Sequence, residues 1–77
     1  MAWFEIVKEF LERFPGVEFS APDIVDTLYP NLSNYNRTMT INKVNQALNT
    51  GLKFGFFEKL ELRDRRRYWR ISEENKD

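Results

Sequence analysis

The spacing of hydrophobic residues changes along this chain from a helical period to a period of two, which divides the chain into helices and a hairpin. In residues 3–14 the apolar side chains fill one arc of a helical wheel drawn at about 100° per residue, and charged side chains fill the opposite arc. We therefore predict an amphipathic first helix that ends at Pro15 and Gly16. The apolar arc consists of Trp3, Phe4, Ile6, Val7, Phe10, Leu11 and Phe14.

A second, shorter helix is predicted to begin after Ser20. A serine at this place can cap the helix, and Asp23 follows three residues later, in the first turn. The helix is expected to end before Pro30. Residues 30–39 are predicted to form a connecting loop, because several of their side chains favour turns by bonding their own backbone. These are Asn31, Ser33, Asn34 and Asn36.

A third helix is predicted over about residues 40–54, capped by Thr38 or Thr40 and closed by Gly55. The face opposite its apolar positions carries no acidic residue and is rich in Asn and Thr, which are mediocre helix formers. We infer that something other than helix stability selected this face. It consists of Asn42, Lys43, Asn45, Gln46, Asn49, Thr50 and Lys53.

Hydrophobic and polar residues alternate along residues 56–71, and this pattern predicts a β-hairpin. The preferred register pairs residues whose numbers add up to 131, because it gathers the apolar side chains on one face. The predicted pairs are Leu60 with Ile71 and Leu62 with Trp69 on the inner face, and Glu61 with Arg70 on the outer face. The loop between the strands is then Asp64-Arg65-Arg66-Arg67.

Composition narrows the classes of protein to consider. A chain of 77 residues holds one hydrophobic core, so we predict one domain over residues 1–72 and a disordered acidic tail over residues 73–77. The absence of Cys and His excludes a disulfide framework and a thiolate zinc site and removes the commonest general base. We expect no enzyme, cofactor, metal or small-molecule substrate. With no long apolar segment and no leader, the chain is expected to be soluble and cytoplasmic, without a membrane partner.

A formal net charge of zero conceals a strong asymmetry. Residues 1–30 have two basic and six acidic side chains, a net charge of −4, whereas residues 31–71 have nine basic and three acidic side chains, a net charge of +6. A local basic patch of this kind is typical of a surface that binds a polyanion. The alternative is an ordinary solvated surface.

The order of a helix, a short capped helix, a loop, a polar-faced helix and a basic hairpin resembles the winged helix-turn-helix domain, an α+β fold with a three-helix core and a C-terminal wing. The matching segments are residues 19–28 for the first helix of the motif, 40–48 for the recognition helix, 52–58 leading into the wing and 65–71 for its return strand. Residues 30–39 are longer than the tight turn of the simplest members. The resemblance implies a DNA-binding transcription regulator.

The residues agree with that implication on chemical grounds. Asn and Gln can pair bidentately with adenine in the major groove, so the amides of the third helix suit direct reading of bases, and Lys43 and Lys53 suit the flanking phosphates. The wing is expected to contact the minor groove or the backbone through Arg63, Arg65, Arg66 and Arg67.

Other functions stay open at this level. The domain could dock on another protein without binding DNA, with Phe4, Ile6, Leu11 and Tyr35 as candidate contacts, or it could bind RNA. A DNA-binding domain of this size often doubles its footprint by two-fold symmetry, and the apolar arc of the first helix is the candidate surface for a homodimer. Binding to heparin or mixed-sequence DNA would discriminate between these classes.

Overall fold

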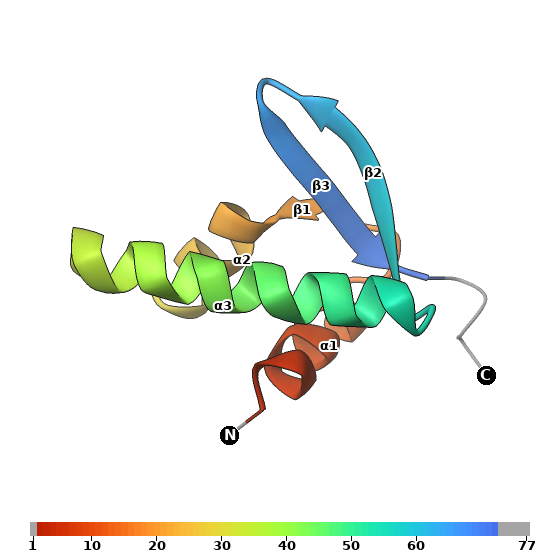
Figure 1. Cartoon of the computed structure of the whole chain (residues 1–77), viewed down its shortest axis with the longest axis horizontal. Coiled ribbons are helices and arrows are strands. Elements are labelled where there is room, and N and C mark those ends of the chain that lie inside the picture. The colour runs from red at the N-terminus through yellow and green to blue at the C-terminus, as the bar shows by residue number, and fades with distance from the viewer. Residues whose placement is uncertain (1, 73–77) are drawn as a thin grey trace.

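A computed structural model describes residues 2–72 of the chain (Figure 1). Met1 and the predicted acidic tail, residues 73–77, lie outside the described residues. The elements follow in the order α1 (Trp3–Arg13), β1 (Phe19–Ser20), α2 (Ala21–Leu28), α3 (Asn34–Lys53), β2 (Phe57–Arg63) and β3 (Arg66–Ile71). The strands form one antiparallel sheet in the order β1-β3-β2, so the described chain is a small α+β domain.

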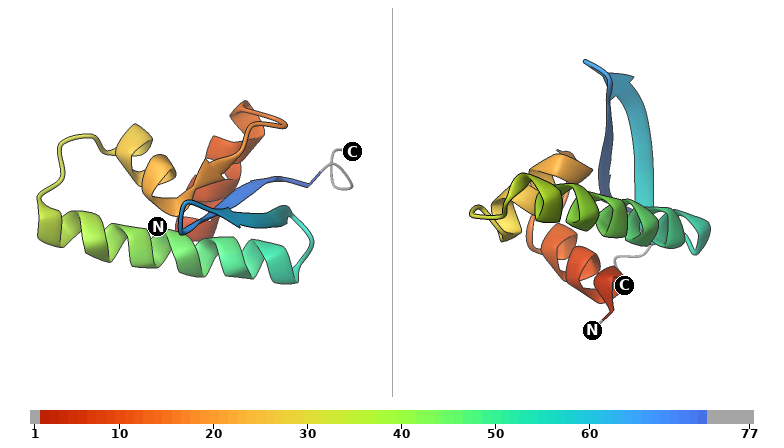
Figure 2. Two further views of the ribbon diagram at one scale, coloured as in Figure 1. Left: turned by 90° about the horizontal axis from the view of Figure 1, so that it is seen from above. Right: turned by 60° about the vertical axis from the view of Figure 1, so that its left-hand side comes forward.

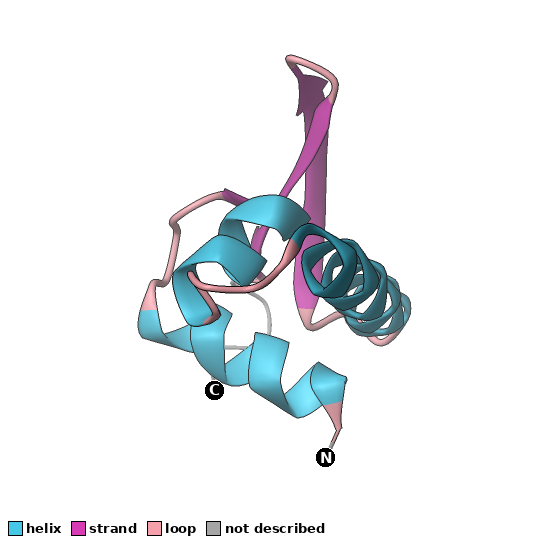
Figure 3. Cartoon of the chain, turned by 90° about the vertical axis from the view of Figure 1, so that its left-hand side faces the viewer, coloured by secondary structure: helices cyan, strands magenta, loops and turns pink. Residues whose placement is uncertain are grey.

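The helices pack together, and the hairpin of β2 and β3 rises away from them (Figures 1 and 3). The N-terminal end of α3 projects at one end of the molecule, whereas its C-terminal end lies beside the base of the hairpin (Figure 2). Within residues 2–72, no helix is both long enough and apolar enough to cross a membrane.

Every helix and the two long strands contribute to a single core. The apolar arc of α1 supplies Val7, Phe10 and Leu11, and the remaining buried apolar residues come from α2, α3 and the sheet. Aromatic rings extend the core at its edges, because Phe10 contacts Phe14 and Phe19 with ring centroids 5.2 and 4.8 Å apart. The rest of the core consists of Ala21, Ile24, Val25, Val44, Ala47, Leu48, Phe57, Trp69 and Ile71.

The start of α2 is confirmed. The Ser20 hydroxyl accepts a hydrogen bond from the Asp23 backbone N–H at 3.2 Å, and the Asp23 carboxylate accepts one from the Ser20 N–H at 3.3 Å. This is a capping box, in which two residues satisfy each other's exposed donors. The sequence did not predict β1, which places Phe19 opposite Trp69, because two residues are too few to show a period.

The predicted start of the third helix is wrong. Helix α3 begins at Asn34, and the Ser33 hydroxyl caps it by accepting a hydrogen bond from the Asn36 N–H at 3.3 Å. Thr38 and Thr40 therefore lie inside the helix, and the predicted loop over residues 30–39 is about half as long. In a helix, asparagine costs at most about 0.7 kcal/mol relative to alanine, and the contacts of α3 with α2, among them the hydrogen bonds from Arg37 to Asp26, outweigh this cost here.

The end of α3 agrees with the prediction that Gly55 closes it. Gly55 has a φ of +81°, a conformation that glycine adopts without steric strain. Its N–H donates to the Leu52 carbonyl at 3.2 Å, and the Phe56 N–H donates to the Gly51 carbonyl at 2.8 Å. These two bonds form a Schellman motif, which turns the chain into β2.

The predicted register of the hairpin is wrong, and so is its four-residue loop. Only Asp64 and Arg65 form the turn, and their φ angles of 51° and 66° give it the mirror-image twist that suits two-residue hairpins. A β-bulge between Lys59 and Leu62 absorbs one extra residue of β2. The observed pairs are Phe57 with Ile71, Glu58 with Arg70, Lys59 with Trp69, Leu62 with Arg67 and Arg63 with Arg66.

The bulge changes what the tip of the hairpin presents. Leu62 lies opposite Arg67, two residues from Trp69 on β3, so it stays on the predicted inner face. Trp69 is buried as expected, with 3% of its surface exposed, but Leu62 is 58% exposed because it borders a hollow between the hairpin tip and the helices. The prediction that Leu62 belongs to the core is therefore wrong.

Candidate nucleic-acid interface

One face of α3 is exposed along the length of the helix and is polar from Asn42 onward. Six exposed residues recur at alternating spacings of four and three, so they fall within an arc of about 80° on the helix surface. We call this line the outward stripe. It consists of Tyr35, Met39, Asn42, Gln46, Asn49 and Lys53.

No carboxylate interrupts this surface, because the 20 residues of α3 include neither Asp nor Glu. The Asn49 amide donates a hydrogen bond to the Asn45 carbonyl one turn earlier, at 3.0 Å. Within residues 2–72, no hydrogen bond or ion pair joins a side chain of the outward stripe to another element. The polar atoms of the stripe are therefore not held by the rest of the fold.

The residues predicted on the third helix divide into a centre and two flanks. Four of them lie on the outward stripe, and Asn45 lies on one flank, partly buried toward the hairpin. Lys43 and Thr50 lie on the other flank, with Lys43 about 160° around the helix from Asn45. Lys43 borders a hollow of about 300 Å³ with Trp3 and Met39 and thus faces α1, away from the hairpin.

A second hollow joins α3 to the hairpin. It has a volume of about 280 Å³ and lies between the first turn of α2, the middle of α3 and the hairpin tip. The fold thus brings Asn45 together with three of the four predicted arginines. The lining residues are Ala21, Pro22, Ile41, Asn45, Leu62, Arg65, Arg66 and Arg67.

Arg63 is separated from this group. Its strand partner Arg66 lines the hollow, but Arg63 does not, and it lies on the face of the hairpin opposite Leu62 and Arg67. Its guanidinium forms an ion pair with Glu18 and lies 4.4 Å from the centre of the Tyr68 ring. The hydrogen bond to Glu18 raises the pKa of Arg63 above its ordinary value. The fold therefore uses Arg63 to join the hairpin to the segment before β1.

Two of the remaining hairpin arginines are also engaged. Arg66 lies 3.5 Å from the Asp23 carboxylate, and Arg67 donates a hydrogen bond to the Leu60 carbonyl at 2.8 Å, at the bulge. For Arg65, residues 2–72 provide neither a hydrogen bond nor an ion pair. Arg65 lies at the tip of the turn and has a left-handed backbone conformation, which residues other than glycine rarely adopt.

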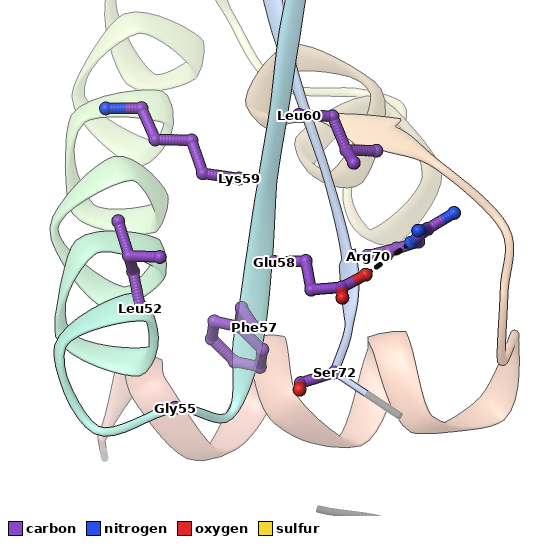
Figure 4. A pocket seen from close by; sticks show the side chains of 8 residues that line it. All are labelled: Leu52, Gly55, Phe57, Glu58, Lys59, Leu60, Arg70 and Ser72. Atoms are coloured by element: carbon purple, nitrogen blue, oxygen red, sulfur yellow. Dashed lines mark hydrogen bonds and ion pairs between the residues drawn. The ribbon is translucent and has the colours of Figure 1, made fainter. Parts of the chain in front are cut away.

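The base of the hairpin has a different character. A hollow of about 410 Å³ follows β2 there, with Leu52 and Lys59 on one side of the strand and Leu60 and Arg70 on the other (Figure 4). The Arg70 Nε atom donates to the Glu58 carboxylate at 2.5 Å. Within residues 2–72, no group of three or more side chains is arranged to hold a metal ion.

The side chains predicted for protein docking are only partly at the surface. Leu11 is fully buried, so its prediction as a contact residue is wrong, because the apolar arc of α1 packs inward. Phe4 and Ile6 are half-buried. Tyr35 is 73% exposed and lies in the first turn of α3. The homodimer through the first helix stays a prediction.

Sequence reasoning missed Tyr35 and Met39 as members of the polar face, because it began the helix after them. The signal was present in the chain: Ser33 can cap a helix, and the alternating spacing of four and three extends back from Asn42 to both residues.

No model of a protein family, no curated protein and no solved structure matches this chain.

Proposed function

We propose that this chain is a winged helix-turn-helix domain that binds double-stranded DNA in a sequence-specific manner and regulates transcription. Helix α3 enters the major groove, and the hairpin is the wing, which meets the minor groove or the backbone of the same site. The order of α1, α2 and α3 followed by a basic hairpin supports this proposal, since it is the order on which the resemblance rests.

The observation that carries the proposal is the chemistry of the outward stripe. Asn42, Gln46 and Asn49 each present a donor and an acceptor, the combination that adenine requires at N6 and N7. These amides add no general attraction to a polyanion. They are therefore better suited to distinguishing base pairs than to holding any nucleic acid.

The charges near the stripe supply the sequence-independent part of the affinity. Lys53 lies at the C-terminal end of the stripe, Lys43 on one flank, and Arg65 at the hairpin tip beyond the other flank. Arg66 and Arg67 line the same hollow as Asn45 and can reach a backbone that passes between α3 and the hairpin. Because carboxylates already hold Arg63 and Arg66, we expect fewer phosphate contacts than the count of arginines suggests.

The test compares sequence-specific binding with binding to any DNA duplex. A preferred site is selected from a pool of random duplex DNA, and binding of wild type and variants is measured by competition against a scrambled duplex. Asn42→Ala is expected to lose about 1–3 kcal/mol on the selected site and almost nothing on the scrambled one. Asn36→Ala is the matched control, because it removes an exposed amide of the same helix about 100° from the centre of the stripe.

Two outcomes would overturn the proposal. Equal losses for Asn42→Ala on both duplexes, or equal effects of Asn42→Ala and Asn36→Ala, would remove α3 as the reader of sequence. If the wild type binds no duplex DNA even at low salt, the alternative of a docking module on another protein takes its place.

A further inference from the structure

The outward stripe begins with two apolar side chains that the fold leaves in solvent. Tyr35 is 73% exposed and Met39 is 45% exposed, and each precedes the amides of the stripe by one or two turns. Within residues 2–72, Tyr35 makes no hydrogen bond and no aromatic contact. Both side chains line up with the amides, so a partner that contacts the stripe can also contact them.

The position of these residues makes them accessible to a large ligand. The N-terminal end of α3 projects at one end of the molecule (Figures 1 and 2). The other end of the helix lies beside the base of the hairpin, and Gly51 packs there against the Phe57 ring on the side of α3 opposite the stripe. The chain then turns at Gly55 into the hairpin. The two ends of the stripe therefore differ in how near a duplex can approach.

The electrostatics of the helix termini favour the same end. The first turns of α1 and α2 contain Glu5 and Asp23, which compensate the positive end of each helix dipole. The first turn of α3 contains no acidic residue, and its cap, Ser33, is neutral. The positive end of α3 is thus left uncompensated by side chains of its own first turn, and this end favours the approach of a polyanion.

Length decides which part of the stripe can reach base edges. The stripe extends over about 27 Å, whereas the major groove is about 12 Å wide and curves around the duplex. A straight helix meets the bases along only a part of such a line, and in helix-turn-helix proteins the N-terminal residues of the recognition helix make these contacts.

We infer that the stripe residues of the first two turns of α3 belong to the DNA-binding surface: Met39 contacts the methyl group of a thymine, and the Tyr35 hydroxyl bonds a phosphate at the edge of the groove. The flexible thioether of methionine adapts to an apolar group, and the thymine methyl is the apolar group exposed in the major groove. The tyrosine hydroxyl is a common donor to phosphate oxygens. These roles rest on the proposed function and add two contacts to it.

The experiment replaces each thymidine of the selected site, one at a time, with deoxyuridine, which lacks only the methyl group. We expect one replacement to weaken wild-type binding about fourfold, the effect of losing one buried methyl-sized group. Met39→Ala is expected to bind the thymidine and deoxyuridine duplexes equally. Tyr35→Phe is expected to weaken binding to the selected and scrambled duplexes alike, because it removes a phosphate contact.

The matched control is Phe54→Ala, which removes an aromatic ring that is 64% exposed at the C-terminal end of α3. Phe54→Ala is expected to leave the affinity for both duplexes unchanged. The urea midpoint of each variant shows whether that variant is folded. If wild type reads its selected site but no thymidine replacement matters, or if Met39→Ala keeps the same sensitivity, the role of Met39 is overturned while the proposed function stands. If wild type binds no duplex, both fall together.

Discussion

Helix α3 and the β2–β3 hairpin both lie in the basic part of the chain, but the fold holds their polar side chains differently. Within the described residues, the outward stripe of α3 makes no hydrogen bond or ion pair with another element. In the hairpin, Arg63 and Arg66 are paired with Glu18 and Asp23, and Arg70 is paired with Glu58.

This difference shows that charge counted along a sequence is not the charge that a ligand meets. The acidic N-terminal part of the chain folds against the basic hairpin, and its carboxylates neutralise part of the charge that the sequence concentrates there. A substitution in the hairpin therefore alters folding and binding together. A substitution on the outward stripe is expected to alter binding alone.

The largest expected effect separates the base of the hairpin from its tip. Trp69→Ala should decrease the free energy of unfolding by about 3–5 kcal/mol, because the indole is buried in the core. Leu62→Ala, on the same face but exposed, should decrease it by less than about 1 kcal/mol. Equilibrium denaturation in urea measures both. Similar losses for the two variants would mean that the tip is also part of the core.

The next effect concerns the salt dependence of DNA binding. Each phosphate contact that is lost should make the slope of log K against log salt shallower by about 0.9. We expect the triple replacement of Arg65, Arg66 and Arg67 by Ala to flatten the slope and to weaken binding to every sequence alike. Arg65→Ala alone should account for about one contact, and Arg63→Ala, which breaks the ion pair with Glu18, should leave the slope unchanged.

Salt titrations of the triple and single variants show which arginines of the hairpin contact phosphates. If the triple leaves the slope unchanged, the hairpin does not touch DNA. If Arg63→Ala flattens it as much as Arg65→Ala, the ion pair with Glu18 does not withhold Arg63 from phosphate.

A smaller effect has opposite signs for folding and binding. Arg65→Gly should increase the free energy of unfolding by about 0.5–1 kcal/mol, because glycine adopts the left-handed conformation of the turn without steric strain. The same change should weaken DNA binding, because it removes the arginine at the tip. Thermal unfolding and duplex titration measure the two effects. Arg63→Gly, in the strand, is the control and should destabilise the fold.

The smallest effect tests the ion pair that joins α3 to α2. The Arg37 guanidinium donates two hydrogen bonds to the Asp26 carboxylate, at 2.7 and 2.9 Å, and they lower the pKa of Asp26 from about 3.8. A lowered pKa in the folded state stabilises the protein above the ordinary pKa, and this stabilisation is lost as the pH falls through the lowered value. It is small because both side chains are exposed.

Wild type and Asp26→Asn should therefore differ in urea midpoint at neutral pH and converge in acid below the lowered pKa. A difference that persists undiminished in acid would show that the carboxylate charge does not hold the two helices together.

The candidate site could be predicted from the sequence only in part. Asn42, Gln46 and Asn49 were identified because an amide-rich helical face without carboxylates is visible in the chain itself, and the fold leaves all three exposed. The partners of the arginines were not visible, because Glu18 lies 45 residues before Arg63. A contact between residues so far apart in the chain depends on how the elements pack, and the composition of the chain does not predict this packing.

The sequence by itself determined the features that depend on residues close together in the chain. The capping box of Ser20 and Asp23 spans three residues, and the closure of α3 at Gly55 depends on the freedom of one glycine. The face of α1 that enters the core follows from helical geometry alone. Each of these is set by the backbone conformation of a single segment.

Only the tertiary structure decided the features that join distant segments. Asp26 and Arg37 stand eleven residues apart, and their contact belongs to the early start of α3. The pairing of Phe19 with Trp69 and the bulge before Leu62 depend on how the sheet meets the helices. Several registers satisfy an alternating pattern of hydrophobic and polar residues. Sliding a strand by one residue moves every side chain to the opposite face of the sheet, so the geometry of the turn and the packing of the core select one register.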